Sequence, residues 1–236
     1  MTDFSTLAGR PTKITARGFG WTHAGRTQPA LADIDLVIEP GERVLLCGDS
    51  GSGKSTFLAA IAGVLGSDEE GTRTGEILLE DSTGAVEEPG HSIPVGLVLQ
   101  DPDSQVISAR VGDDIAFGCE NLAYPREEIW RRVAAAKDLV GPFVDMDFPT
   151  ERLSGGQKQR LALVGVIAMG AGVVLLDEPT ANLDPAGARD VVRAVSALVE
   201  ETGATLVVVE HQHTAWEGLL DRAVEIAHGR IVADGP

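Results

Sequence analysis

The chain has 236 residues, of which 43% are hydrophobic and 23% are charged, so it can bury the core of one large globular domain. Its 36 acidic and 19 basic residues give a net charge of -17, which argues against nucleic-acid binding, because binding to a duplex depends on Lys and Arg at the phosphates. No stretch is long and apolar enough to span a bilayer, the first residues lack the order of a secretory signal, and two cysteines are too few for a disulfide framework. These properties predict a cytoplasmic protein.

Strand and helix patterns alternate along the chain. In residues 32–42 apolar side chains alternate with polar ones before a Pro-Gly turn, as in a half-buried strand. Continuous apolar runs, typical of strands buried on both faces of a parallel sheet, occupy residues 43–48, 173–177 and 205–211. Helical patterns occupy residues 55–65, 127–140, 157–169 and 186–200. Residues 223–235 read as two short strands around a His-Gly turn. The alternation predicts an α/β fold.

The segment GDSGSGKST directly follows the first of these apolar runs and fits the phosphate-binding pattern G-x-x-x-x-G-K-[ST]. Its glycines let successive N–H groups turn toward an anion, and the following helix directs the positive end of its dipole to the same point. We expect Lys54 to reach the β- and γ-phosphates of a nucleotide, and the Ser55 hydroxyl to ligate Mg²⁺. The residues expected to bind nucleotide are Gly48, Asp49, Ser50, Gly51, Ser52, Gly53, Lys54, Ser55 and Thr56.

Two acids end the apolar run at 173–177, where a magnesium-dependent phosphate site needs carboxylates. Asp177 is expected to hold Mg²⁺, and Glu178, one residue further, is expected to face the γ-phosphate as general base for a water. Read without the phosphate-binding loop, the pair is an ordinary acidic end of a strand.

Residues 153–160 read LSGGQKQR, a Ser-Gly-Gly turn that opens a helix. Such a turn presents a second anion site at a helix N-terminus, although read alone it is equally well an ordinary helix cap. One chain would then hold two phosphate sites but a single set of Mg²⁺ ligands. A head-to-tail dimer, in which the second site of each chain closes on the nucleotide of its partner, accounts for both.

Together with a histidine after a distal strand, these motifs resemble the ATPase subunit of an ABC transporter over essentially the whole chain. The resemblance implies an α/β P-loop NTPase fold with a RecA-like parallel core, an antiparallel β N-terminal part and an inserted helical subdomain. It implies one domain over residues 1–236, with the nucleotide-binding core in 1–100 and 155–236. The helical signature subdomain is expected in 101–154, where the strand–helix alternation breaks.

The resemblance also implies roles for further residues. Gln100 matches the Q-loop glutamine that contacts Mg²⁺ and the attacking water, and His211 matches the switch histidine at the γ-phosphate. Asp184 matches the D-loop aspartate that links the two sites of a dimer. Trp21 stands where the family usually has a tyrosine that stacks on adenine, and core packing is the alternative for this ring. The signature residues expected to act in trans are Leu153, Ser154, Gly155, Gly156 and Gln157.

Residues 99–129 are similar to the corresponding segment of energy-coupling-factor importers, which take up vitamins or metal ions through a shared transmembrane subunit. This similarity implies ATP and Mg²⁺ as cofactors, ATP-driven closure of the dimer, and docking of a transmembrane subunit in the groove after Gln100. It therefore places the chain on the cytoplasmic face of the membrane. The acids available to coupling-helix arginines are Asp101, Asp103, Asp113 and Asp114, with a solvated acidic face as the alternative.

Other functions stay open at this level. An exporter or mechanotransmission ATPase shares every motif, whereas net charge disfavours a DNA-repair or chromosome ATPase, and the presence of Glu178 and His211 disfavours a non-catalytic regulator. The second ATPase domain is expected in an identical chain, in a different chain or in a tandem half. The tandem half is an alternative because family members commonly continue beyond the point where this chain ends. The transported substrate is not encoded here, because specificity in this family resides in the membrane-embedded binding subunit.

Overall fold

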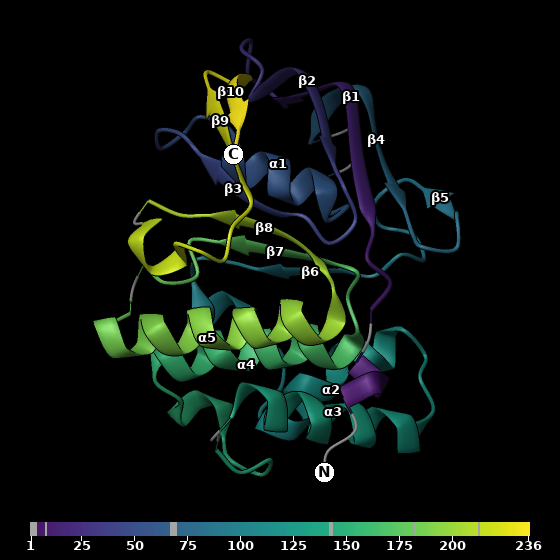
Figure 1. Ribbon diagram of the computed structural model, residues 1–236, viewed down its shortest axis with the longest axis vertical. Coiled ribbons are helices and arrows are strands. Elements are labelled where there is room, and N and C mark those ends of the chain that lie inside the picture. Colours follow the sequence, from purple (N-terminus) through teal and green to yellow (C-terminus); the bar gives the residue numbers. More distant parts are fainter. Residues whose placement is uncertain (1–3, 8, 67–69, 142–143, 182, 212) are drawn as a thin grey trace.

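The computed structural model describes residues 4–7, 9–66, 70–141, 144–181, 183–211 and 213–236, and it arranges them in layers (Figure 1). A four-stranded antiparallel sheet has the order β2-β1-β4-β5, and a six-stranded sheet has the order β10-β9-β3-β8-β7-β6. The strands are β1 (Lys13–His23), β2 (Leu31–Ile38), β3 (Arg43–Cys47), β4 (Gly71–Glu80), β5 (Val86–Glu87), β6 (Val95–Val98), β7 (Val173–Asp177), β8 (Thr205–Val209), β9 (Arg222–Ala227) and β10 (Arg230–Gly235). The α-helices are α1 (Lys54–Ile61), α2 (Val111–Asn121), α3 (Arg126–Val140), α4 (Gly155–Met169) and α5 (Pro185–Thr202). Short 3₁₀ helices are η1 (Phe4–Leu7), η2 (Pro102–Gln105), η3 (Thr150–Arg152) and η4 (His213–Trp216).

The centre of the six-stranded sheet is parallel. Strand β3 pairs in parallel with β8 and β9, β8 pairs with β7, and β7 pairs with β6. All five residues of both β7 and β8 are buried, because α1 covers one face of this sheet and α4 and α5 cover the other (Figure 1). The carboxyl ends of β3, β6, β7 and β8 therefore meet at one edge, where ligands of open α/β sheets bind.

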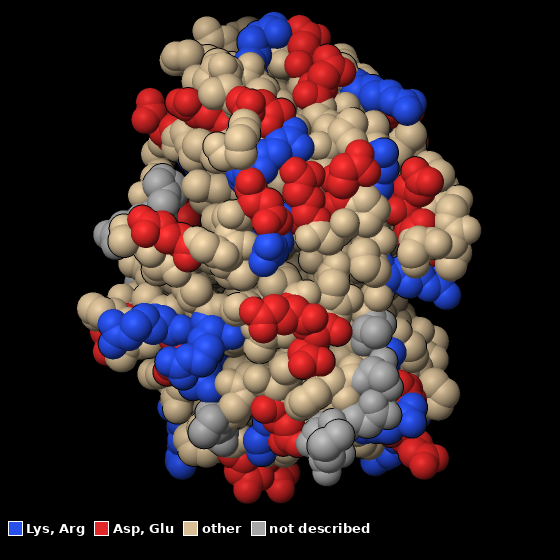
Figure 2. Space-filling model, viewed as in Figure 1, with Lys and Arg blue, Asp and Glu red and all other residues tan. Residues whose placement is uncertain are grey.

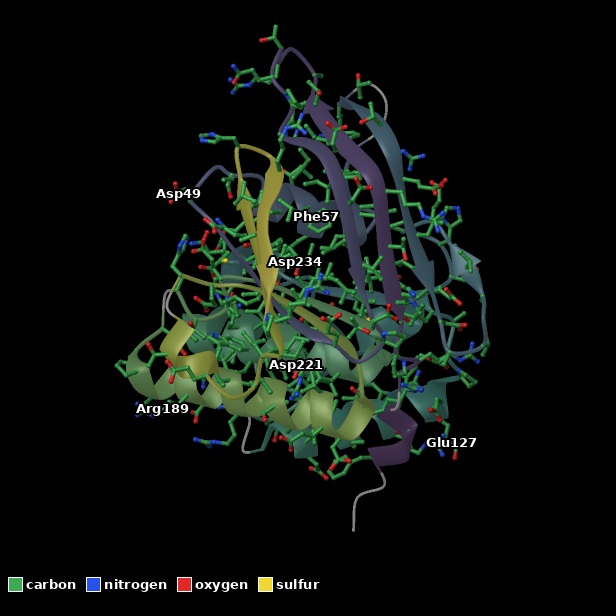
Figure 3. All side chains as sticks on the ribbon, turned by 45° about the horizontal axis from the view of Figure 1, so that its top comes forward. Asp49, Phe57, Glu127, Arg189, Asp221 and Asp234 are labelled. Atoms are coloured by element: carbon green, nitrogen blue, oxygen red, sulfur yellow. The ribbon has the colours of Figure 1, made fainter. Side chains whose placement is uncertain are left out.

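The N-terminal part of the chain forms the antiparallel sheet, with α1 between it and the parallel strands (Figure 1). Phe57 of α1 is fully buried and packs in one core cluster with residues of both sheets (Figure 3). The predicted α/β class with an antiparallel N-terminal part is confirmed.

Helices α2 and α3 form a lobe that packs on α4, on the side away from the sheets (Figure 1). Arg132 of α3 is buried in this lobe, where its Nε lies 2.9 Å from Glu128 Oε1 and its Nη1 donates to the Ala168 carbonyl at 3.2 Å. Helix α4 also packs against α5 and β6, so it joins the lobe to the sheet. The subdomain boundary at residue 154 remains a prediction.

Two elements end earlier than the sequence predicts. Helix α1 stops at Ile61 instead of residue 65, because Gly63 has a positive φ of 71° that leaves the helical conformation. Strand β8 stops at Val209, which frees Glu210 and His211 for the site described below.

Figure 2 shows acidic residues distributed over one face of the molecule, with a group of basic atoms near one end of α5. Arg189 and Arg193 belong to α5, and the side chain of Arg189 projects outward from it (Figure 3). Among the described residues, no helix has the length and apolar character needed to cross a bilayer.

Candidate nucleotide-binding site

The loop between β3 and α1 needs glycine at two positions for both conformation and space. Gly48 has φ 134° and Gly53 has φ 112°, in the region that side chains of L-residues rarely adopt. A Cβ atom on Gly48 would lie 2.1 Å from the Ile226 carbonyl oxygen of β9, and one on Gly53 would lie 2.6 Å from the Ala30 carbonyl oxygen. The loop is therefore seated tightly between β9 and the connection that follows β1.

Lys54 begins α1 and is held inside this loop, with only 6% of its surface exposed. Its Nζ donates to the carbonyl oxygens of Gly48 at 2.7 Å and Asp49 at 2.9 Å. The first N–H groups of α1 have no partner inside the helix and carry the positive end of its dipole. The loop thus gathers an ammonium and free N–H groups at one point, a combination suited to binding phosphate.

Ser55 and Asp177 meet at the edge of the sheet although 122 positions separate them in the printed sequence. Burial raises the pKa of the Asp177 carboxyl, at the end of β7, above its ordinary value, and the nearby Ser55 side chain opposes this shift. One hydroxyl and one carboxylate are oxygen ligands of the kind that Mg²⁺ takes when substrate phosphates supply other positions. The pair fits a magnesium site that is completed by a bound nucleotide.

The raised pKa of Asp177 predicts that removing its charge stabilises the nucleotide-free chain. Between the ordinary pKa and the raised one the folded chain binds more protons than the unfolded chain, so stability falls as pH rises through this window. At pH values above this window the ionised carboxylate lowers the free energy of unfolding by a constant amount. We expect Asp177→Asn to raise the melting temperature at pH 7, by about 2–4 °C for each kcal/mol that it adds to the free energy of unfolding. Thermal melts of Glu217→Gln, which changes an exposed acid, provide the control. A lower melting temperature for Asp177→Asn would contradict the prediction.

The three side chains that the sequence assigns to catalysis, Gln100, Glu178 and His211, are in contact. Gln100 lies after β6, and its Nε2 donates to Glu178 Oε2 at 2.9 Å. His211 Nε2 lies 3.0 Å from Glu178 Oε1. Glu178 itself has a positive φ of 48°, a strained conformation for a side-chain-bearing residue. Its backbone N–H donates to the Val209 carbonyl at 2.9 Å, which holds the strained residue against the end of β8.

Lys54, Ser55, Gln100 and Glu178 line one cavity, whereas His211 lines a neighbouring one with Glu178 and Glu210. The cavity is lined by the loop after β3 with the start of α1, by Gln100 and Glu178, and by one residue each from the end of β1 and from the β1–β2 connection. The lining residues are His23, Ala30, Ser50, Gly51, Gly53, Lys54, Ser55, Thr56, Gln100 and Glu178. Phosphate-binding groups and a held carboxylate therefore share a single enclosure, as the order of the motifs predicts.

Trp21 lies where the alternative for its ring, core packing, expects it, and its contact with adenine stays a prediction. Its side chain is 4% exposed and packs in the core between the antiparallel sheet and α1. The cause is the register of β1, because Trp21 pairs with Leu31 of β2 and Arg73 of β4 in the interior of that sheet. His23, two residues further along β1, lines the cavity of the phosphate-binding loop.

The signature residues lie outside the cavity lining of their own chain. Ser154 caps α4 in a capping box, in which its side chain accepts from the Gln157 N–H at 3.3 Å and its own N–H donates to Gln157 Oε1 at 2.9 Å. A Cβ on Gly156 would lie 3.4 Å from Leu183 Cδ2, so the signature turn adjoins the D-loop. Asp184 caps α5 by accepting from the Gly187 N–H at 2.8 Å. The signature turn and the D-loop therefore lie together, and neither lines the cavity of the loop after β3.

Sequence reasoning missed Glu210, which is 4% exposed. Its Oε1 accepts from both the N–H of Thr180 at 3.1 Å and the hydroxyl of Thr180 at 2.5 Å. Thr180 follows Glu178 by two positions, so this pair of hydrogen bonds fixes the segment that carries the predicted base. A carboxylate that directly ends an all-apolar strand was the signal available in the sequence.

We expect Glu210→Ala to destabilise the chain by about 2 kcal/mol, because the two donors of Thr180 lose a buried acceptor. Chemical denaturation measures this difference, with Glu217→Ala as a control for an exposed acid in the same part of the chain. A cycle with Thr180→Val should show coupling of at least about 0.5 kcal/mol. Additive effects of the two changes would contradict the role assigned to Glu210.

Three of the four acids expected to receive coupling-helix arginines are used within the chain. Asp103 pairs with Lys158 of α4, and Asp101 accepts from the Asp103 N–H at 3.0 Å. Asp114 accepts from the N–H groups of Ile107 and Ser108 at 2.8 and 2.9 Å. Within the described part of the chain, Asp113 has no recorded partner and is exposed. Contact of coupling-helix arginines with the four carboxylates stays a prediction, with Asp113 the most freely placed of them.

Comparison with known proteins agrees with this arrangement. A family model described as ABC transporter matches residues 31–181. The chain belongs to this ABC transporter family. It is 38% identical over 216 residues to the energy-coupling factor transporter ATP-binding protein EcfA1 of Caldanaerobacter subterraneus subsp. tengcongensis, covering 89% of this chain and 74% of that protein.

A putative ABC transporter ATP-binding protein of Methanosarcina acetivorans is 38% identical over 226 residues. That match covers 95% of this chain but 35% of the relative, so the chain spans about a third of that protein. The solved structure of cbiO1 from Clostridium perfringens, part of the ABC transporter complex cbiONQ, has a TM-score of 0.78 and 31% identity, covering 96% of this chain and 88% of that one. The chain is thus an ATP-binding domain of the ABC transporter family.

Proposed function

We propose that this chain hydrolyses ATP as the motor subunit of an ABC importer of the energy-coupling-factor type. The observation that carries the proposal is the Glu178 carboxylate, held between Gln100 and His211 in the cavity that also contains Lys54 and Ser55. The importer type is supported by the likeness to EcfA1 and to cbiO1 of the cbiONQ complex.

Each residue has a distinct task in hydrolysis. Lys54 and the N–H groups of the loop bind the phosphates, and Ser55 and Asp177 would hold Mg²⁺, with Gln100 adjoining it; the ion supplies charge neutralisation. Glu178 accepts a proton from the water whose oxygen bonds to the γ-phosphorus as the bond to the ADP oxygen breaks. His211 and Gln100 orient Glu178 through their contacts with its two carboxylate oxygens.

A second ATPase domain completes the site. Ser154, Gly155, Gly156 and Gln157 lie outside the cavity of their own chain and are at least partly exposed, so they are available to close on the nucleotide of a partner. Leu153, predicted with them, is 6% exposed and packs in the core instead. The N-terminus of α4 is suited to that task, because Ser154 and Gly155 are exposed there and the positive end of the helix dipole lies at this point. Asp184, at the start of α5, adjoins the same surface and would link the two sites.

The transmembrane partner is expected to dock on the segment between β6 and α2. Leu99 and Ile107 expose apolar side chains there, with Ile107 58% exposed, and Asp113 supplies an available carboxylate. Docking would place the chain on the cytoplasmic face of the membrane, where closure of the dimer drives uptake of a vitamin or metal ion. Ile107→Asp should reduce copurification of the transmembrane subunit from native membranes, whereas Val64→Asp, which changes another exposed aliphatic residue, should not.

Phosphate release tests the proposed activity directly. The purified chain should release phosphate from ATP only with Mg²⁺ present, and Lys54→Ala should abolish nucleotide binding and release together. Glu217→Ala serves as the control, because it changes an exposed acid outside the cavity. Release that persists in Lys54→Ala would show that the activity does not come from this cavity.

A further inference from the structure

A cavity of about 460 Å³ lies between the α2–α3 lobe and the β4–β5 hairpin, and the proposed function assigns it no role. The described residues that line it include none that line the nucleotide cavity. Pro94 and Gly172 belong to its lining and directly precede β6 and β7, so it lies beside the amino ends of these strands. Gln100 and Glu178 follow the carboxyl ends of the same strands. The cavity is therefore a separate site, and its volume is in the range of small-molecule pockets.

The wall that the lobe forms holds a guanidinium with an unused N–H group. Arg132 of α3 is 8% exposed, and its Nε and Nη1 donate to Glu128 and to the Ala168 carbonyl. Within the part of the chain that the structure describes, its Nη2 has no recorded acceptor, and this atom is not fully enclosed by protein. The guanidinium lies 4.3 Å over the Tyr124 ring, and both side chains line the cavity. Nη2 is therefore available to an acceptor inside the cavity, and a carboxylate suits it best, because hydrogen bonds between a guanidinium and a carboxylate are charge-assisted.

The opposite wall holds two carboxylates that differ in their remaining capacity. Asp81 is paired with Arg10, whose Nη1 lies 3.0 Å away, and further hydrogen bonds from the β4–β5 turn fill its other acceptor positions. Glu87 accepts from the N–H and the hydroxyl of Ser92 at 2.8 and 2.6 Å, and among the described residues it has no recorded ion-pair partner. These hydrogen bonds lower the pKa of Glu87 below its ordinary value, so its carboxylate is ionised at neutral pH. A carboxylate has about four acceptor positions, so Glu87 can also hold a cation.

We propose that this cavity binds a small zwitterion with apolar side chains, namely an amino acid or a short peptide, whose carboxylate meets Arg132 and whose ammonium meets Glu87. A simple anion would face the like charge of Glu87, and a simple cation would face that of Arg132, so a molecule with both charges complements both walls. Leu122, Ile93 and Pro94 add apolar surface for its side chains. Because one wall belongs to the lobe and the other to the antiparallel sheet, the ligand would hold these two parts of the chain together.

Calorimetric titration of the full chain without nucleotide tests the proposal with L-leucine and with L-leucyl-L-leucine. The two probes differ in the separation of their charges, and we expect at least one of them to bind. Acetylation of the amino group or amidation of the carboxyl group removes one of the two charges. Each modified form of the bound probe should therefore bind at least about tenfold more weakly, the effect of losing one hydrogen bond between charged groups.

Two substitutions test the walls separately, each with a matched control. Glu87→Gln should weaken binding of the zwitterion about tenfold, whereas Glu88→Gln, which changes the exposed neighbour outside the cavity, should not. Arg132→Lys removes Nη2 and should have a similar effect, whereas Arg131→Lys, which changes the exposed neighbour outside the cavity, should have none. Thermal melts show whether Arg132→Lys is folded, and if it is not, Glu87→Gln alone decides.

Several results would overturn the proposal. Absence of binding by both zwitterions would show that the cavity does not take this class of ligand. Unchanged affinity of the acetylated probe would make it a site for a simple anion, and unchanged affinity of the amidated probe would make it a site for a simple cation. Unchanged binding in Glu87→Gln would place the ligand outside this cavity. Binding should persist in Lys54→Ala, so the result does not depend on the proposed ATPase function.

Discussion

Replacing Glu178 with Gln is expected to lower phosphate release by a factor of about 100 or more while ATP still binds. The amide keeps the shape of the carboxylate and its place between Gln100 and His211, but it cannot accept the proton of the attacking water. Blocked hydrolysis should trap the state in which ATP is sandwiched between two domains. Light scattering of the variant with and without MgATP measures its mass in solution, which shows whether the closed dimer is trapped and whether an identical chain can form it.

The mass in solution distinguishes the possible partners. A doubling that requires MgATP would mean that Ser154 of one identical chain closes the site of the other. A monomer that binds ATP would assign the closing signature to a different chain or to a tandem half. Ser154→Arg in the Glu178→Gln background is the matched control, because its bulk and charge should block closure without touching the cavity of its own chain. Hydrolysis that continues in Glu178→Gln would exclude Glu178 as the base.

Gly48→Ala is the second change expected to have a large effect. The new Cβ would lie 2.1 Å from the Ile226 carbonyl oxygen and 3.0 Å from Ser52 Oγ, and φ is 134°. The clash and the backbone strain together should cost about 3 kcal/mol or more. Because Lys54 Nζ donates to the carbonyl of Gly48, the shift of the loop should also displace the ammonium. We expect a lower melting temperature and loss of MgADP binding.

Gly84→Ala is the control for this change. Gly84 also has a positive φ, 82°, but a Cβ there would meet nothing within 4 Å. Its cost is therefore limited to backbone strain, about 1 kcal/mol, with MgADP binding unchanged. If Gly48→Ala binds MgADP as well as Gly84→Ala does, the loop tolerates a side chain and the close approach to β9 is not required for binding.

Local sequence was sufficient for the parts of the site that depend on short-range geometry. The loop from Gly48 to Thr56 combines backbone freedom with a helix start, and both follow from neighbouring residues. The apolar runs before Asp177 and His211 likewise predict buried parallel strands, because only strands covered on both faces are apolar throughout. Parallel strands then bring their carboxyl ends to one edge, so the meeting of Lys54 with Glu178 follows from the fold class.

Tertiary structure alone decided which ring of β1 reaches the cavity and which acids have partners within the chain. Trp21 and His23 differ in exposure because of their register against β2 and β4, a long-range property that strand periodicity does not encode. Asp103 is neutralised by Lys158, a residue of α4 that only the packing of the lobe brings near. Glu210 acts on Thr180 across two neighbouring strand ends. Each depends on pairing between distant segments, so the motifs determined the chemistry of the site, and packing determined which side chains take part.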